Sequence, residues 1–167
     1  MDYLCKEDPK EPRRRFVWAF KAGDHLAIET ASQLLLRSLL RRESALRLTA
    51  LRPILLAAPG HLPVPTPSPQ ERLCSQLARL LPWLEHRPAA LVRTKAIRRS
   101  SSASVRPTAS EHLSTLACTA PFRGAHVILV DDVFTLGRTT DACRTLLVDA
   151  GARSVVIAAL ARTRLPL

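Results

Sequence analysis

The sequence has few cysteines, and none of them shows the paired spacing of a metal site. The four lie far apart in the chain, at Cys5, Cys74, Cys118 and Cys143, with no CxxC pair among them. This spacing predicts neither a zinc site nor a disulfide framework and fits a reducing compartment. The charged amino terminus is not followed by a hydrophobic segment of the signal-peptide kind. We therefore expect a cytoplasmic protein, with Cys143 in the core on the apolar face of a predicted helix.

Long hydrophobic runs and aromatic side chains are also missing. The longest uncharged stretch, Pro53 to Gln70, holds six prolines and cannot form a membrane-spanning helix. Aromatic residues make up 4% of the chain, which leaves no aromatic-rich face for binding nucleic acid. Acidic residues number 14 against 25 basic ones, and the resulting charge of +11 favours anionic partners. Nucleotides, phosphorylated sugars, nucleic acid and acidic proteins are the candidate classes.

What the sequence does contain is an alternation of helical and strand-like patterns. Its 167 residues, 47% of them hydrophobic, suit one domain with a real core. We expect a polar amino-terminal arm over residues 1–15 and a single domain over 16–167. Helical spacing occurs in three stretches: 24–51, 71–84 and 138–149. Continuous apolar runs predict buried strands at 126–130 and 154–161, and shorter runs are candidate strands at 54–58, 62–64, 90–94 and 113–118. Such alternation predicts an α/β fold, in which helices cover both faces of a parallel sheet.

One stretch, VILVDDVFTLGRTTDACRTLL over residues 127–147, combines a buried strand with groups typical of a ligand site. Asp131 and Asp132 follow the apolar run, at the strand end where parallel α/β sheets bind ligands. The turn after them leads into a helix whose first N–H groups attract anions, best a phosphate. Gly137 permits close approach of the backbone, and the hydroxyls of three threonines can donate hydrogen bonds: Thr135, Thr139 and Thr140.

The carboxylates at this site suit sugar hydroxyls or a divalent cation, whereas the helix amino end suits a phosphate. A ribose 5-phosphate has groups for both parts of the site. Other phosphate motifs fit less well, because the turn has no P-loop lysine and only one glycine. A DxD motif would need a carboxylate where Val133 stands. The alternative reading is a strand that ends in an aspartate pair which only caps the next helix.

The segment VILVDDVFTLGRTT resembles the phosphoribosyl-pyrophosphate (PRPP) binding motif of type I phosphoribosyltransferases. It is most similar to the ComF-type subgroup, whose pattern resembles hydrophobic-VDDV-x-TTG-x-T, and the likeness continues through DAGARSVVIAALART. The resemblance implies a three-layer, Rossmann-like domain in which Asp131 and Asp132 are the catalytic carboxylates and hold the ribose hydroxyls. It also implies that backbone N–H groups of five residues wrap the 5-phosphate: Thr135, Leu136, Gly137, Arg138 and Thr139.

The sequence departs from the subgroup's pattern in three places. Leu136 replaces a second threonine or small residue, and Arg138 replaces a small residue that lies near the phosphate. The glutamine and asparagine pattern of the ComF-type loop is replaced by RRSSSASVRPTASEH, and no zinc-ribbon cysteines precede the domain. These departures leave the expected fold unchanged and bear on the substrate.

The other half of PRPP is a pyrophosphate, which implies Mg²⁺ as a cofactor that arrives with PRPP and needs no direct protein ligand. The family's mobile loop corresponds to residues 95–110, which contain basic residues but no acid before Glu111. Candidates for pairing with pyrophosphate are Lys95, Arg98 and Arg99. A second contact would come from a turn at Ala58–His61 or Pro63–Thr66, between which the sequence does not choose. His61 and His112 are further candidates for contact with the ligand, although histidines in such positions are more often ordinary surface residues.

The resemblance implies an enzyme of nucleotide metabolism, a phosphoribosyltransferase with an unknown acceptor. It would move the phosphoribosyl group to or from a base or amine, with pyrophosphate as co-product. A regulatory protein that binds PRPP or a nucleotide without turnover is one alternative. A ComF-like factor associated with DNA uptake is another, which the resemblance and the charge of +11 support and the lack of an aromatic-rich face does not. The expected partner is the small phosphoribosyl substrate, with no membrane and with a homodimer left open.

Overall fold

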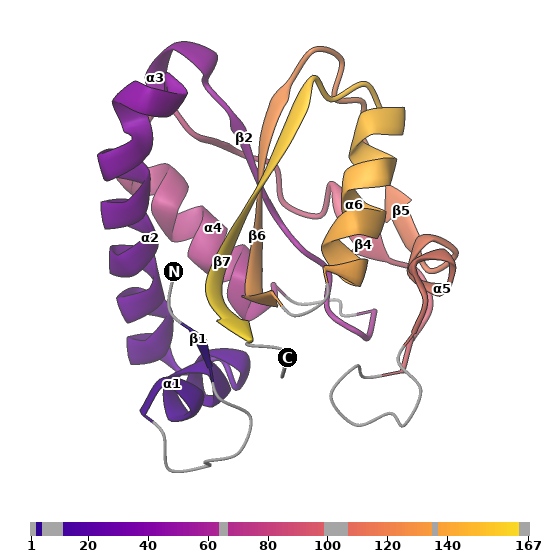
Figure 1. The fold of residues 1–167 in the computed structure, drawn as a ribbon, viewed down its shortest axis with the longest axis horizontal. Helices are drawn as coiled ribbons and strands as arrows, with labels where there is room; N and C mark the ends of the chain where they lie inside the picture. Colours follow the sequence, from indigo (N-terminus) through magenta and orange to yellow (C-terminus); the bar gives the residue numbers. More distant parts are fainter. Residues whose placement is uncertain (1–2, 5–11, 64–66, 99–106, 135–136, 164–167) are drawn as a thin grey trace.

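The computed structural model describes residues 3–4, 12–63, 67–98, 107–134 and 137–163. In these ranges a parallel sheet has the strand order β1-β7-β6-β2-β3, and helices lie on both of its faces (Figure 1). Its strands are β1 (Tyr3–Leu4), β2 (Ile54–Ala57), β3 (Glu85–His86), β6 (His126–Phe134) and β7 (Ser154–Thr163). The helices are α1 (Pro12–Lys21), α2 (His25–Leu46), α3 (Leu48–Leu51), α4 (Pro69–Leu80), α5 (Ala109–Leu113) and α6 (Arg138–Asp149). The predicted α/β fold with a parallel sheet is confirmed.

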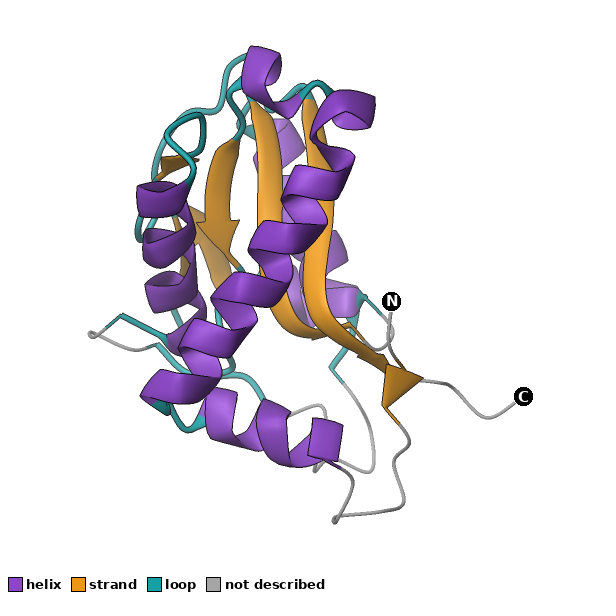
Figure 2. Ribbon diagram, turned by 90° about the vertical axis from the view of Figure 1, so that its left-hand side faces the viewer, coloured by secondary structure: helices purple, strands orange, loops and turns teal. Residues whose placement is uncertain are grey.

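The central strand β6 separates two hydrophobic cores, since successive side chains of a strand point to opposite faces. Ile128 and Val130 pack with buried residues of α1, α2 and α4. Val127 and Leu129 pack on the other face, with Cys143 and other residues of α6. Figure 1 shows the resulting layers from the side, with α2 and α6 on opposite sides of the strands, and Figure 2 looks onto one face of the sheet with the long helix α2 in front. Cys143 is fully buried, as predicted.

A small antiparallel sheet stands apart from the main one. It pairs β4 (Leu91–Arg93) with β5 (Leu116–Cys118), and both lie near α5 and α6 in Figure 1. The predicted strand at 90–94 therefore forms, but outside the parallel sheet. Of the candidate strand at 113–118 only the last part is extended, because α5 ends at Leu113. The candidate at 62–64 is wrong for residues 62–63, which form no strand, and Val64 lies outside the described residues.

Three further expectations about element bounds need correction. The predicted arm over 1–15 overlaps α1, which begins at Pro12, where the missing proline N–H costs nothing, and which is anchored by buried Val17 and Phe20. The predicted helix over 24–51 breaks at Arg47, whose φ of 51° is left-handed. The strand predicted as buried at 154–161 is partly exposed, with Val156 47% exposed. Within the described ranges no helix is both long and apolar enough to cross a bilayer.

Candidate functional site

The carboxyl end of β2 lies beside Val130 of β6, which continues beyond it to Phe134. The two strands pair in parallel from Ile54 with Val127 to Ala57 with Val130. The N–H of Ala58 then donates to the carbonyl of Val130 at 2.8 Å. The turn that follows β2 therefore begins at the level of Asp131. Parallel α/β sheets bind ligands at the carboxyl ends of their strands.

The two aspartates lie inside β6, not after it, because the strand continues to Phe134 in register with β7. Each carboxylate accepts the N–H of the next residue, Asp131 at 2.8 Å and Asp132 at 2.6 Å. Burial, followed by the charge of Asp132, raises the pKa of Asp131 to about 7. Near neutral pH the Asp131 carboxyl can therefore either donate or accept a proton.

Asp132 has a cationic partner that sequence reasoning missed. The ammonium of Lys21, the last residue of α1, lies 3.2 Å from its Oδ2. Lys21 is half exposed, whereas only 12% of the Asp132 side chain is. The same lysine opposes the rise in the pKa of Asp131. The apolar spacing of Phe16, Val17 and Phe20 was the available sign that a helix would carry Lys21 to the sheet edge.

Gly137, the residue that caps the amino end of α6, has a backbone conformation that other residues rarely adopt. Its φ is +76°, and a Cβ built on it would lie 2.9 Å from Cζ of Phe134. The turn therefore requires glycine for both its backbone angle and the space. The predicted turn residues Thr135 and Leu136 lie outside the described residues.

The first residues of α6 use their side chains in different ways. Thr140 was predicted to donate to a ligand, but its buried hydroxyl donates instead to the carbonyl of Gly137 at 2.8 Å. Arg138 Nη1 donates to the carbonyl of Pro107 at 3.0 Å and so ties α6 to the segment before α5. Thr139, the second residue of the helix, has its Oγ1 3.5 Å from Nδ1 of His112.

His112 is not the surface histidine that was expected. Its exposed fraction is 3%, because α5 packs against the amino end of α6. Burial lowers the pKa of its imidazole, and the nearby Arg93 lowers it further. Its buried Nε2 has no hydrogen-bond partner among the described residues. The sequence gives no sign of this, since α5 is short and lies in a polar segment.

Arg93 is a buried cation that, among the described residues, donates hydrogen bonds to two neutral groups. It is 6% exposed, and its Nε donates to the carbonyl of Gly60 at 2.7 Å. Its Nη1 donates to the hydroxyl of Thr115 on the adjacent chain segment. Within the described part of the chain no carboxylate forms an ion pair with Arg93, and burial lowers the pKa of its guanidinium. A buried guanidinium of this kind attracts an anionic group.

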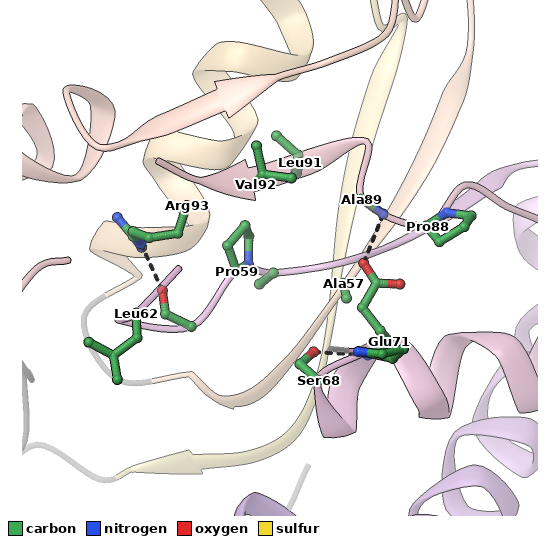
Figure 3. A pocket seen from close by; sticks show the side chains of 13 residues that line it. Ala57, Pro59, Leu62, Ser68, Glu71, Pro88, Ala89, Leu91, Val92 and Arg93 are labelled. Atoms are coloured by element: carbon green, nitrogen blue, oxygen red, sulfur yellow. Dashed lines mark hydrogen bonds between the residues drawn. The ribbon is translucent and has the colours of Figure 1, made fainter. Parts of the chain in front are cut away.

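A pocket of about 210 Å³ opens beside Arg93 (Figure 3). The turn after β2 lines it with Ala58, Pro59 and Gly60, and the amino end of α4 lines it with Ser68. Of the two turns considered from the sequence, Ala58–His61 thus borders the pocket, while residues 64–66 of the second lie outside the described residues. The amino end of α4 and the buried arginine favour anions here. The carboxylate of Glu71 also lines the pocket, where it contacts His86 Nε2 at 2.8 Å and accepts the N–H of Ala89 at 3.2 Å.

The basic loop after β4 is only partly described. Its start lies beside the turn that follows β2, because the N–H of Ile97 donates to the carbonyl of His61 at 2.9 Å. Lys95 is exposed, and Arg98 forms an ion pair with Glu111 at 2.8 Å. Arg99 lies outside the described residues. The structure therefore places the loop's beginning beside the pocket, with the Arg98 head group engaged by Glu111.

No protein-family model matches this sequence, and no curated protein matches it. Solved structures with a similar fold include a purine phosphoribosyltransferase from Pyrococcus horikoshii, with a TM-score of 0.47 and 14% identity over 81% of this chain and 73% of that one. A hypoxanthine phosphoribosyltransferase of Trypanosoma cruzi has a TM-score of 0.44 and 15% identity, over 90% of this chain and 70% of that one. At such low similarity these likenesses carry no argument about activity, which rests on the site itself.

Proposed function

We propose that this chain binds PRPP, or a related ribose 5-phosphate, at the carboxyl ends of β2 and β6 and transfers its phosphoribosyl group. One observation supports the proposal most strongly. Asp131 and Asp132 of β6 are followed closely along the chain by Gly137, the cap of α6, so that two carboxylates and a helix amino end belong to one strand–turn–helix unit. Carboxylates accept sugar hydroxyls, and the amino end of a helix binds a phosphate. The resemblance of the same residues to the PRPP motif supports the same conclusion.

Each part of PRPP has a place in this proposal. The ribose hydroxyls lie against Asp131 and Asp132, and the 5-phosphate takes the N–H groups at Gly137, Arg138 and Thr139. The pyrophosphate occupies the pocket between the turn Ala58–His61 and the amino end of α4, within reach of Arg93. The buried charge of Arg93 supports this placement, because it would then gain the anionic partner that the described residues do not supply.

In the transfer step a base or amine nitrogen forms a bond to C1 of the ribose while the bond from C1 to the pyrophosphate oxygen breaks. The electron pair of that bond leaves with pyrophosphate, and positive charge develops on the ribose ring. The attacking nitrogen, once bonded to C1, loses its proton to water. Asp131 and Asp132 orient the ribose beneath this charge, and Arg93 stabilises the negative charge on the leaving group. Mg²⁺, when bound to PRPP, neutralises pyrophosphate oxygens. The remaining negative charge of PRPP then requires cations and N–H groups from the protein, which Arg93 and the amino ends of α4 and α6 would supply.

The test is to mix the protein with PRPP, Mg²⁺ and a panel of purine and pyrimidine bases and to measure released pyrophosphate. We expect release that depends on one base and is lost in Asp132→Asn. Asp149→Asn is a matched control, because Asp149 is exposed at the far end of α6. Release that is unchanged in Asp132→Asn would refute the assignment of the site.

A second candidate is a binding protein that holds PRPP without turnover. The ion pair of Lys21 with Asp132 favours it, since one of the two carboxylates is already engaged from α1. This candidate predicts that PRPP binds while no base in the panel releases pyrophosphate. Turnover with any base would exclude it.

A further inference from the structure

His112 combines three features that an ordinary structural histidine does not share. It is 97% removed from solvent by the packing of α5, since only 3% of it is exposed. Its Nε2 is buried and has no hydrogen-bond partner among the described residues. Its Nδ1 lies 3.5 Å from the hydroxyl of Thr139, at the second position of α6. Buried polar atoms without hydrogen-bond partners are rare in folded proteins, so this nitrogen requires an explanation, and a functional role is one.

The charges around His112 are unbalanced. Arg93 on β4 and Arg138 on α6 both disfavour a charged imidazole, and only Glu111, on its own helix, favours one. Glu111 is itself engaged by Arg98 and by the N–H of Thr108. Asp131 on β6, whose pKa is raised to about 7, is a second titrating group that the test must separate from His112. Two guanidiniums and the positive end of α6 thus act on a neutral imidazole. The carboxylate of Asp141, in the first turn of α6, lies near Gly137 and is not among the charges that shift the pKa of His112. What the imidazole itself lacks is a nearby anion that is not already engaged.

We propose that His112 is a proton-linked positioning residue for the anion site at the amino end of α6. Its Nδ1–H donates to Thr139 Oγ1, which leaves the hydroxyl hydrogen of Thr139 free to be donated to a bound phosphate. A dianion there supplies the missing negative charge, so Nε2 takes a proton from the solvent on binding and returns it on release. This inference uses the phosphate site of the proposed function and adds to it a residue and a proton.

The direction of the pH effect follows from burial and charge. Without an anion, burial and Arg93 hold the pKa of His112 below its ordinary value of 6.5, so the imidazole is neutral at pH 7. A bound dianion raises that pKa, because it favours the charged form. Binding therefore consumes a proton in the interval between the two pKa values, and affinity for the dianion rises as the pH falls through it.

The test uses inorganic sulfate, a dianion that does not titrate in this range, because a phosphate ester has its own pKa near 6. Calorimetry at pH 6.5 in two buffers with different ionisation enthalpies gives the number of protons taken up per sulfate. We expect wild type to take up a large fraction of one proton. We also expect its sulfate affinity to rise about ten-fold for each pKa unit that binding adds to His112.

Variants separate His112 from the other titrating groups. His112→Gln should bind sulfate more weakly and with little proton uptake, while His126→Gln should behave like wild type. His126 is a fair control because it lies at the opposite end of β6, where its Nδ1 is 2.7 Å from Ser154 Oγ. Equal uptake by wild type and His112→Gln would assign the proton to Asp131 and overturn the proposal.

Two further outcomes are decisive. Sulfate binding by wild type without proton uptake would overturn the role of His112 and leave the phosphate site intact. No sulfate binding at all would remove this inference together with the phosphate site of the proposed function. If His112→Gln does not fold, wild type labelled with ¹⁵N-histidine decides the question at pH 6.5. One imidazole should change from neutral to charged when sulfate is added, and no such change would overturn the proposal.

Discussion

Replacing Asp131 by asparagine should make the ligand-free protein more stable at alkaline pH. The reason is the environment of this carboxyl, where burial and the charge of Asp132 raise its pKa from 3.8 to about 7. Asparagine has the same shape and can still accept the N–H of Asp132, which lies 2.8 Å from Asp131 Oδ1. It has no charge to bury. The substitution thus removes the cost of ionisation and leaves the local hydrogen bond in place.

The size and sign of the change in the free energy of unfolding follow from the linkage between proton binding and folding. In the unfolded chain Asp131 ionises near 3.8, whereas in the folded protein it keeps its proton to about 7. Its contribution to stability is thus fully present below 3.8 and is lost as the pH rises through 7. Each pKa unit corresponds to about 1.4 kcal/mol, so the ceiling is about 4 kcal/mol. Because Asp131 is only partly buried, we expect a gain of about 1–3 kcal/mol at pH 8.

Urea denaturation at pH 4, 6 and 8 measures this effect. We expect Asp131→Asn to match wild type at pH 4 and to exceed it increasingly at pH 6 and 8. Asp149→Asn is the control, since Asp149 is exposed and its substitution should give no gain that grows with pH. An Asp131→Asn protein that is no more stable than wild type at pH 8 would refute the reasoning about the buried carboxyl.

Three other substitutions test neighbouring parts of the site. Asp132→Asn should weaken PRPP binding at least ten-fold in calorimetry, because a charge-assisted acceptor is worth about 1.5–3 kcal/mol; unchanged affinity would place the ribose elsewhere. Gly137→Ala should lower the free energy of unfolding by about 1–3 kcal/mol, since φ is +76° and the new Cβ meets the ring of Phe134; an unaffected urea midpoint would contradict the required turn. Lys21→Met should move the pKa of Asp131 above about 7, because the lysine charge lowers it; a carboxyl ¹³C titration that shows no rise would contradict the contact across the sheet edge.

Local patterns predicted the parts of the fold whose cause is local. The helix from Arg138 to Asp149 was predicted with these bounds, because its apolar period and Gly151 lie within a short stretch of chain. The apolar run at 126–130 predicted the central strand for the same reason. Its extension through Asp132 to Phe134 could not be foreseen, since it depends on pairing with β7.

The parts that escaped prediction depend on contacts between distant residues. His112 and Thr139 are 27 positions apart, and the burial of His112 comes from the packing of α5 on α6. The ion pair of Lys21 and Asp132 joins the first helix to the central strand. Arg93 was visible in the sequence as one basic residue among several, and only its burial beside Gly60 distinguishes it. Polar residues carry no periodic signal from which such contacts could be read.

The most direct test of the proposed site is the binding of PRPP with Mg²⁺ to the wild-type protein, measured by calorimetry. The proposal predicts saturable binding with one PRPP per chain, weakened at least ten-fold by Asp132→Asn as expected for a lost charge-assisted hydrogen bond. Binding of ribose 5-phosphate at the same site, in competition with PRPP, should accompany it. If neither ligand binds to folded wild-type protein, the assignment of a phosphoribosyl site to β6 and the amino end of α6 is wrong.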